Sequence, residues 1–122
     1  MSVLENAQQL QQMMAENKTM EAFDKFYHDE VKVVEVPTGE TRNGKEAQRE
    51  AINQWYNSVE EFHDGGCNSI CANEDQQTST AETWMDITLK DGGRMKMSEV
   101  AVQKWKDGQI IEEKFYYNMP QQ

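Results

Sequence analysis

The 122-residue chain lacks several features that mark particular classes of protein. It has no apolar run near the roughly 20 residues that span a bilayer, so no transmembrane helix is expected. Its first residues carry neither a basic nor a hydrophobic segment, so we expect no signal peptide and predict a cytoplasmic protein. It contains no glycine-rich phosphate loop, nucleophile elbow or nucleotide-binding fingerprint. We therefore expect no cofactor.

Basic residues are scarce relative to acidic ones. The chain has 12 Lys and Arg against 22 Asp and Glu, which gives a formal charge of −10. A surface of this charge repels phosphate backbones and anionic lipid headgroups. Neither a nucleic acid nor a membrane is an expected partner.

Cysteine and histidine are also rare, with Cys67, Cys71, His28 and His63 as the complete set. If the two cysteines lie on one strand, they are about 13 Å apart, which is too far for a disulfide. No other Cys or His stands at the spacing of a metal-binding motif. The sequence predicts two reduced thiols and no metal site.

The apolar residues present, 37% of the chain, are enough for one modest core. We expect a single domain over residues 1–122. Apolar residues recur at helical spacing over residues 3–16, 20–28 and 44–63. Ser2 and Glu5 form a capping box at the start of the first of these predicted helices.

Strand patterns dominate the rest of the chain. β-branched residues predict a strand over 31–36, ended by Pro37. After Gly66 the pattern predicts further strands at 67–74, 77–90, 94–105 and 109–117. Helices early and an antiparallel sheet late are typical of an α+β domain.

The turn at Asp91-Gly92 predicts how the second and third of these later strands pair. A two-residue hairpin loop there places Trp84 opposite Glu99 and Glu82 opposite Ala101. Side chains directly opposite each other point to the same face of a sheet. The register therefore predicts one face that carries both tryptophan and glutamate side chains.

The turn near Gly108 leaves two alternatives open. In a three-residue loop with Gly108 in the left-handed conformation, Ala101 faces Glu113, and Glu113, Phe115 and Tyr117 join the face of Glu99. A two-residue Asp107-Gly108 turn sends these three side chains to the other face. The first alternative gives a face that mixes aromatic and polar side chains, as the wall of a ligand pocket does.

Three strings in this order resemble the SnoaL-like branch of the nuclear transport factor 2-like superfamily. They are Phe26-Tyr-His-Asp-Glu-Val31, Arg42-Asn-Gly-Lys-Glu-Ala47 and Trp105-Lys-Asp-Gly-Gln-Ile-Ile-Glu-Glu113. The likeness runs from about Leu4 to Tyr117. It implies a cystatin-like cone in which N-terminal helices pack on a curved, mixed, mostly antiparallel sheet around a pocket. It also implies homodimers formed through the sheet.

The resemblance does not carry over the catalytic residues of ketosteroid isomerase, one member of the superfamily. The position of its general base is Val36 here, which cannot accept a proton. The positions of its oxyanion-binding tyrosine and protonated aspartate fall near Gln12 or Met13 and near Ala101. Steroid isomerisation by that mechanism is therefore not expected.

The predicted site combines these patterns. We expect Glu99 to act as a general base, with Glu113 or Tyr117 as the donor, because apolar neighbours raise the pKa of a glutamate. The predicted function is a small-molecule pocket protein, with possible cofactor-independent lyase, isomerase or hydrolase activity on an apolar or polyketide-like molecule. The alternative is a ligand-binding or dimeric interaction module without activity. The predicted ligand-binding residues are Phe23, Tyr27, Trp55, Val59, Glu82, Trp84, Ala101, Gln103, Phe115 and Tyr117.

The opposite face of the predicted hairpin is apolar. It carries Met85, Ile87, Val100 and Val102 in the register given above. Because a small domain that leaves such a face in water tends to aggregate, we predict that this face forms a homodimer interface.

Overall fold

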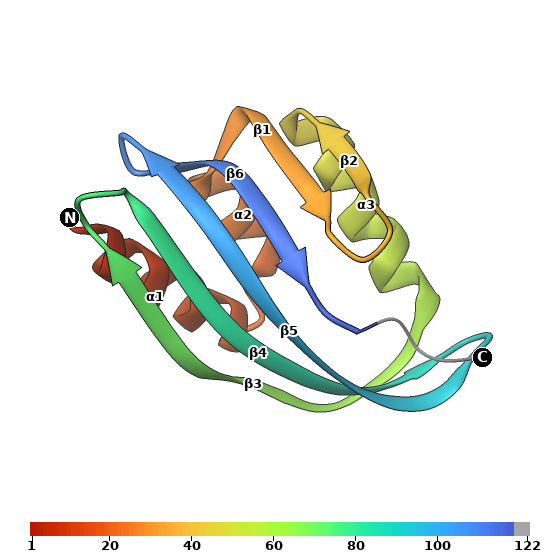
Figure 1. The fold of residues 1–122 in the computed structure, drawn as a ribbon. Coiled ribbons are helices and arrows are strands. Elements are labelled where there is room, and N and C mark those ends of the chain that lie inside the picture. Colours follow the sequence, from red (N-terminus) through yellow and green to blue (C-terminus); the bar gives the residue numbers. More distant parts are fainter. Residues whose placement is uncertain (119–122) are drawn as a thin grey trace.

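The computed structural model describes residues 1–118, which form three helices and six strands. Figure 1 shows all three helices on one side of a strongly curved sheet. The elements are α1 (Val3–Ala15), α2 (Thr19–Phe26), β1 (Tyr27–Glu35), β2 (Glu40–Asn43), α3 (Lys45–Ser58), β3 (Val59–Asn73), β4 (Thr78–Leu89), β5 (Gly93–Lys106) and β6 (Gln109–Tyr116).

The six strands form one mixed sheet in the order β2-β1-β6-β5-β4-β3. Only the β1–β6 pair is parallel within the described residues, and every other neighbouring pair is antiparallel. The parallel pair brings β6 beside β1, the first strand. The expected α+β class, with helices packed on a curved and mostly antiparallel sheet, is confirmed.

The helices begin and end close to the predicted residues, with one exception. The capping box is present, because Ser2 Oγ accepts from the Glu5 backbone and the Glu5 carboxylate accepts from the Ser2 backbone. The prediction that the third helix reaches residue 63 is wrong, since α3 ends at Ser58. Val59 already pairs with Leu89 in the sheet. No helix among residues 1–118 is long and apolar enough to cross a membrane.

The β4–β5 register differs by one residue from the prediction. Leu89 pairs with Gly93, so the loop has three residues, and Gly93 takes a φ of +72°. The Lys90 backbone N–H donates to the Ser58 carbonyl at 2.9 Å instead of pairing across the hairpin. Contact with the end of α3 therefore removes Lys90 from the ladder and shifts every pair by one.

This shift overturns two predicted groupings. Trp84 pairs with Ser98 and Glu82 with Val100, so both lie on the outer face, away from Glu99. Met85 and Ile87 pair with Met97 and Met95, which places them on the inner face. The apolar face predicted from Met85, Ile87, Val100 and Val102 is thus split between the two sides of the sheet.

The turn before β6 combines parts of both alternatives. Lys106 pairs with Gln109, and Asp107 and Gly108 have φ values of +51° and +80°, so this is a two-residue turn. A β-bulge after Lys104 then shifts the register by one residue. As a result Glu113 faces inward, as the three-residue loop predicted.

The main core lies between α1, α2 and the inner face of the sheet. T-shaped contact of the Phe26 and Trp105 rings, with centroids 5.8 Å apart, joins α2 to β5. The core consists of Val3, Ala7, Leu10, Ala22, Phe23, Phe26, Tyr27, Val31, Val33, Trp105 and Ile110. This core does not include Glu99 or the residues next to it on β5.

Candidate functional site

The candidate site lies on the inner face of β1, β6 and β5. Val33 pairs with Glu113 and Glu113 pairs with Gln103, so their side chains form one row across the strands. Two residues further along, Glu35 pairs with Phe115, and Phe115 with Ala101, in a second row. Glu99 lies beyond Ala101 on β5, on the same face.

Glu113 is the buried centre of the site, with 1% of its surface exposed. Its carboxylate accepts a short hydrogen bond from the Tyr27 hydroxyl and a second, of 2.7 Å, from Gln103 Nε2. Burial raises the pKa of Glu113 to about 7, although both hydrogen bonds act in the opposite direction. Burial and the nearby Glu113 charge raise the pKa of Tyr27 well above its usual value. Tyr27 is therefore a neutral donor at physiological pH.

A chain of buried polar side chains continues from Glu113 across the sheet. Gln103 Oε1 accepts from Ser79 Oγ at 2.8 Å, and Ser79 Oγ accepts from Trp105 Nε1 at 2.8 Å. Gln103, Ser79 and Trp105 are all buried. The chain satisfies each of these polar groups without water, as a buried network requires.

Glu99 differs from Glu113 in its surroundings. Its side chain is half-buried and makes no hydrogen bond or ion pair within residues 1–118. Burial, and then repulsion by Glu113 and Glu35, raises the pKa of Glu99 to about 7. A carboxyl group with this pKa exists in both protonation states near neutral pH, which general acid–base chemistry requires.

A third carboxylate, Glu35, is fully paired. It accepts from Arg42 Nη2 at 2.7 Å and from the Tyr117 hydroxyl at 2.9 Å. Arg42 Nε also donates to Gln48 Oε1 on α3 at 2.7 Å. Burial and the bond to Glu35 raise the pKa of Tyr117 to about 12. The cluster ties the ends of β1 and β6 to β2 and α3 beside the Glu99–Glu113 pair.

An open hollow of about 490 Å³ adjoins this cluster, where β1 and β6 end beside β5. Glu99 and Tyr117 contribute to its wall. The remaining lining residues are Val36, Pro37, Glu82, Ser98, Val100, Tyr116 and Asn118. Glu82, Ser98, Val100 and Tyr116 of this wall lie on the outer face of the sheet. Of the glutamate pair, Glu99 lines the hollow and Glu113 does not.

The structure brings some predicted site residues together and separates others. Glu99, Ala101, Gln103, Glu113, Phe115 and Tyr117 share the inner face, and Tyr27 reaches the same cluster. Phe23 packs on Tyr27 in the core, with ring centroids 4.8 Å apart. Trp55 is 36% exposed on α3, and Val59 begins β3.

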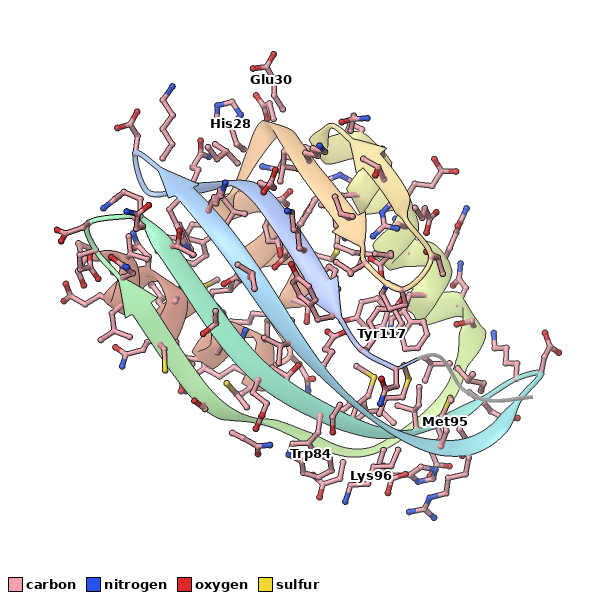
Figure 2. All side chains as sticks on the ribbon, viewed as in Figure 1. His28, Glu30, Trp84, Met95, Lys96 and Tyr117 are labelled. Carbon is pink, nitrogen blue, oxygen red and sulfur yellow. The ribbon has the colours of Figure 1, made fainter. Side chains whose placement is uncertain are left out.

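Glu82 and Trp84 lie on the outer face of the sheet and not beside Glu99 as predicted, although Glu82 still lines the hollow. Figure 2 shows Trp84 and Lys96 projecting from the outer side, with Tyr117 on the side of the helices. The Lys96 ammonium lies 4.8 Å from the centroid of the Trp84 ring. The expected contact of Trp84 with Glu99 is therefore absent.

Sequence reasoning missed Ser79, Glu35 and Arg42. Ser79 lies on β4 two residues before Ala81, so the correct hairpin register would have placed it opposite Gln103. Glu35 and Arg42 pair through the short β1–β2 hairpin, whose register follows from the loop after Pro37. Their approach to the other glutamates depends on the parallel β1–β6 pairing, for which no local signal exists.

Within residues 1–118, no three His, Cys, Asp or Glu side chains are grouped so as to hold a metal ion. His63 instead contacts Thr88 Oγ1 at 2.7 Å and the Glu61 carboxylate at 2.8 Å. The chemistry that the described residues offer is proton transfer by glutamate and hydrogen bonding by tyrosine.

Comparison with known proteins places the chain in a family. A sequence model of the SnoaL-like domain matches residues 1–117. A search of the curated proteins finds no match. Among solved structures, a candidate SnoaL-like polyketide cyclase from Mesorhizobium loti is 29% identical and has a TM-score of 0.82. The match covers 96% of this chain and 100% of that one.

Two more distant structures share the fold. A nuclear transport factor 2-like protein of unknown function from Burkholderia pseudomallei is 10% identical, with a TM-score of 0.76 and coverage of 95% of this chain and 90% of that one. A candidate isomerase from Bacillus subtilis is 17% identical, with a TM-score of 0.75 and coverage of 93% and 84%. With the match over residues 1–117, these likenesses lead to one conclusion: the chain belongs to the SnoaL-like domain family and has the nuclear transport factor 2-like fold.

Proposed function

We propose that the chain binds a small organic molecule beside Glu99 and catalyses a cofactor-independent proton transfer on it. The observation that carries this proposal is the contrast between two neighbouring glutamates. Glu113 is buried and hydrogen-bonded, whereas Glu99 borders a hollow and has no partner within the described residues. A carboxyl group held near neutrality at an open site is suited to accept a proton from a bound molecule.

The proposed step is removal of a proton from an acidic carbon or hydroxyl group. The proton moves to a Glu99 carboxylate oxygen. The electron pair left behind moves onto a neighbouring carbonyl oxygen when the proton comes from carbon, and stays on the oxygen when it comes from a hydroxyl group. Tyr117 lies at the same hollow, and its raised pKa keeps it a neutral donor. Tyr117 would turn its single hydroxyl hydrogen from Glu35 to the developing oxyanion. Such a step is common to lyase, isomerase and cyclisation reactions, and the solved relatives include candidate cyclases and isomerases.

The experiment uses small uncharged ketones, whose α-hydrogens exchange with deuterium when a base removes them. NMR would follow this exchange in D₂O for a panel of cyclic ketones. We expect the chain to accelerate exchange for at least one ketone, with a rate that rises with pH through about 7. Glu99→Gln should slow exchange by about 100-fold or more while ketone binding persists. Glu60→Gln is the matched control, because Glu60 is exposed on β3.

Equal exchange in the wild type and in Glu99→Gln would contradict the proposal. Binding of a ketone without any acceleration would favour the alternative, a ligand-binding module without activity. One observation favours instead a dimeric interaction module without activity: four predicted ligand residues, Phe23, Tyr27, Ala101 and Gln103, are buried.

We propose in addition that two copies of the chain associate through the outer face of the sheet. Val34, Val102 and Lys114 share one row on this face, and Val100 and Tyr116 share the next. Tyr116 is 43% exposed and Val36, at the end of β1, is 40% exposed. Val36, Val100 and Tyr116 also line the hollow, so the second copy would form part of its wall. Burial of these apolar side chains against a second copy would remove them from water. Val100 and Val102 of the predicted interface remain part of this proposal.

A further inference from the structure

The chain of hydrogen bonds that ends at Glu113 runs in a single direction. The Trp105 indole N–H can only donate, so Ser79 Oγ is the acceptor in that bond. The Ser79 hydroxyl hydrogen is then directed to Gln103 Oε1. This orients the Gln103 amide so that its Nε2, and not its oxygen, faces Glu113.

The direction of the chain has a consequence for Glu113. Both carboxyl oxygens of Glu113 accept, one from Gln103 and one from Tyr27, which is the pattern of a charged carboxylate. Glu99 receives no donor within residues 1–118. Hydrogen bonding to the charged form favours that form, so these bonds lower the pKa of Glu113 and have no counterpart at Glu99.

The charged groups around the pair are few. Glu113 faces Tyr27 and Glu35 on β1 and Glu99 on β5, and the Arg42 guanidinium on β2 is the one cation that acts on it among the described residues. Arg42 itself is bound to Glu35, Glu40 and Gln48. The hydrogen bonds from Tyr27 and Gln103 are therefore the largest of the influences that favour the charged form of Glu113.

We propose that Trp105, Ser79 and Gln103 are positioning residues that hold Glu113 in its charged form. Glu99 is then the member of the Glu99–Glu113 pair that carries a proton. None of the three touches the hollow, so they act through Glu113. The inference rests on the proposed function only for its effect on turnover. If Glu99 is the general base, the charge on Glu113 raises the pKa of Glu99 and so sets the pH at which Glu99 can accept a proton.

The test follows the two carboxyl groups separately, by NMR titration of ¹³C-labelled glutamate in the full chain. In Gln103→Met, Glu113 loses one donor, and we expect its pKa to rise by about one unit. Glu113 then carries less charge near neutrality and repels the Glu99 carboxylate less. The pKa of Glu99 should fall at the same time. Shifts in opposite directions distinguish this role from a general loosening of the fold.

Two further variants keep the test decisive if Gln103→Met does not fold. Ser79→Ala removes the hydroxyl that orients Gln103, and Trp105→Phe removes the donor to Ser79 while it retains an aromatic ring. Both should raise the pKa of Glu113 and lower that of Glu99, by less than Gln103→Met. Trp84→Phe is the matched control, because Trp84 lies on the outer face, and it should leave both titrations unchanged.

An unchanged Glu113 titration in all three variants, or shifts of both glutamates in the same direction, would overturn the inference. The titrations need no substrate, so they are independent of the proposed activity. Opposite shifts together with equal ketone exchange in the wild type and in Glu99→Gln would support the positioning role and refute the proposed function.

Discussion

Tyr27 and Glu113, which are 86 residues apart in the sequence, are joined by a buried hydrogen bond. Tyr27 begins β1 directly after α2, and Glu113 lies on β6, the parallel neighbour of β1. The bond links the first strand of the chain to the last one. It also places a neutral phenol against the one fully buried carboxyl group of residues 1–118.

Loss of this phenol should destabilise the fold measurably. In Tyr27→Phe the ring still packs on Phe23, but the Glu113 carboxylate loses one of its two donors. We expect the free energy of unfolding at pH 8 to fall by about 1.5–3 kcal/mol, the range for a hydrogen bond to a charged group. Urea denaturation provides the measurement. Tyr56→Phe is the control, because Tyr56 is 51% exposed, and a similar loss in this control would refute the explanation.

Glu99 and Glu113 should make the folded chain less stable as pH rises. The pKa values of Glu99 and Glu113 are about 7 in the folded chain, against an ordinary value of 4.5. Between these values the folded state binds more protons than the unfolded state, so the free energy of unfolding decreases as pH rises. Urea midpoints should therefore decline from pH 5 to pH 8. Glu99→Gln should weaken the decline, and an identical pH profile in this variant would contradict the assignment.

The Arg42–Glu35 ion pair should contribute far more than the other ion pairs of the sheet. Both side chains are largely shielded, with exposures of 15% and 17%. Arg42→Met leaves the Glu35 carboxylate beside Glu99 and Glu113 without its cation, and should lower the free energy of unfolding by about 3 kcal/mol. Arg94→Met is the matched control, because Arg94 is 63% exposed in its pair with Asp86. That variant should change stability by less than about 1 kcal/mol, and equal effects would argue against a special role for Arg42.

The proposed dimer predicts a mass of twice 14.2 kDa. Light scattering at tens of micromolar should report this mass for the wild type. Val100→Glu places a charge at the centre of the outer apolar rows and should produce a folded monomer. Val59→Glu, at the start of β3 away from these rows, should remain dimeric. A wild-type chain that is monomeric at this concentration would exclude the interface.

Local sequence signals determined the element types and much of the site. The capping box at Ser2, the helical spacing of α1 and α2, and the β-branched run before Pro37 each depend on residues close together in the chain. Such signals are readable because backbone conformation and burial periodicity are local properties. The inward direction of Glu99, Gln103 and Glu113 on their strands also follows from period-two alternation once one of them is placed.

Tertiary contacts decided which side chains meet. The Lys90 bond to Ser58 lengthened the β4–β5 loop by one residue and moved Trp84 to the outer face, and the bulge after Lys104 kept Glu113 on the inner face. A shift of one residue in the register moves every side chain of a strand to the other face of the sheet. The loop length and the bulge therefore decide which side chains share a face. The parallel pairing of β1 with β6 brought Tyr27, Glu35 and Glu113 together. No local pattern encodes that pairing, because its free energy comes from core burial between segments at opposite ends of the chain.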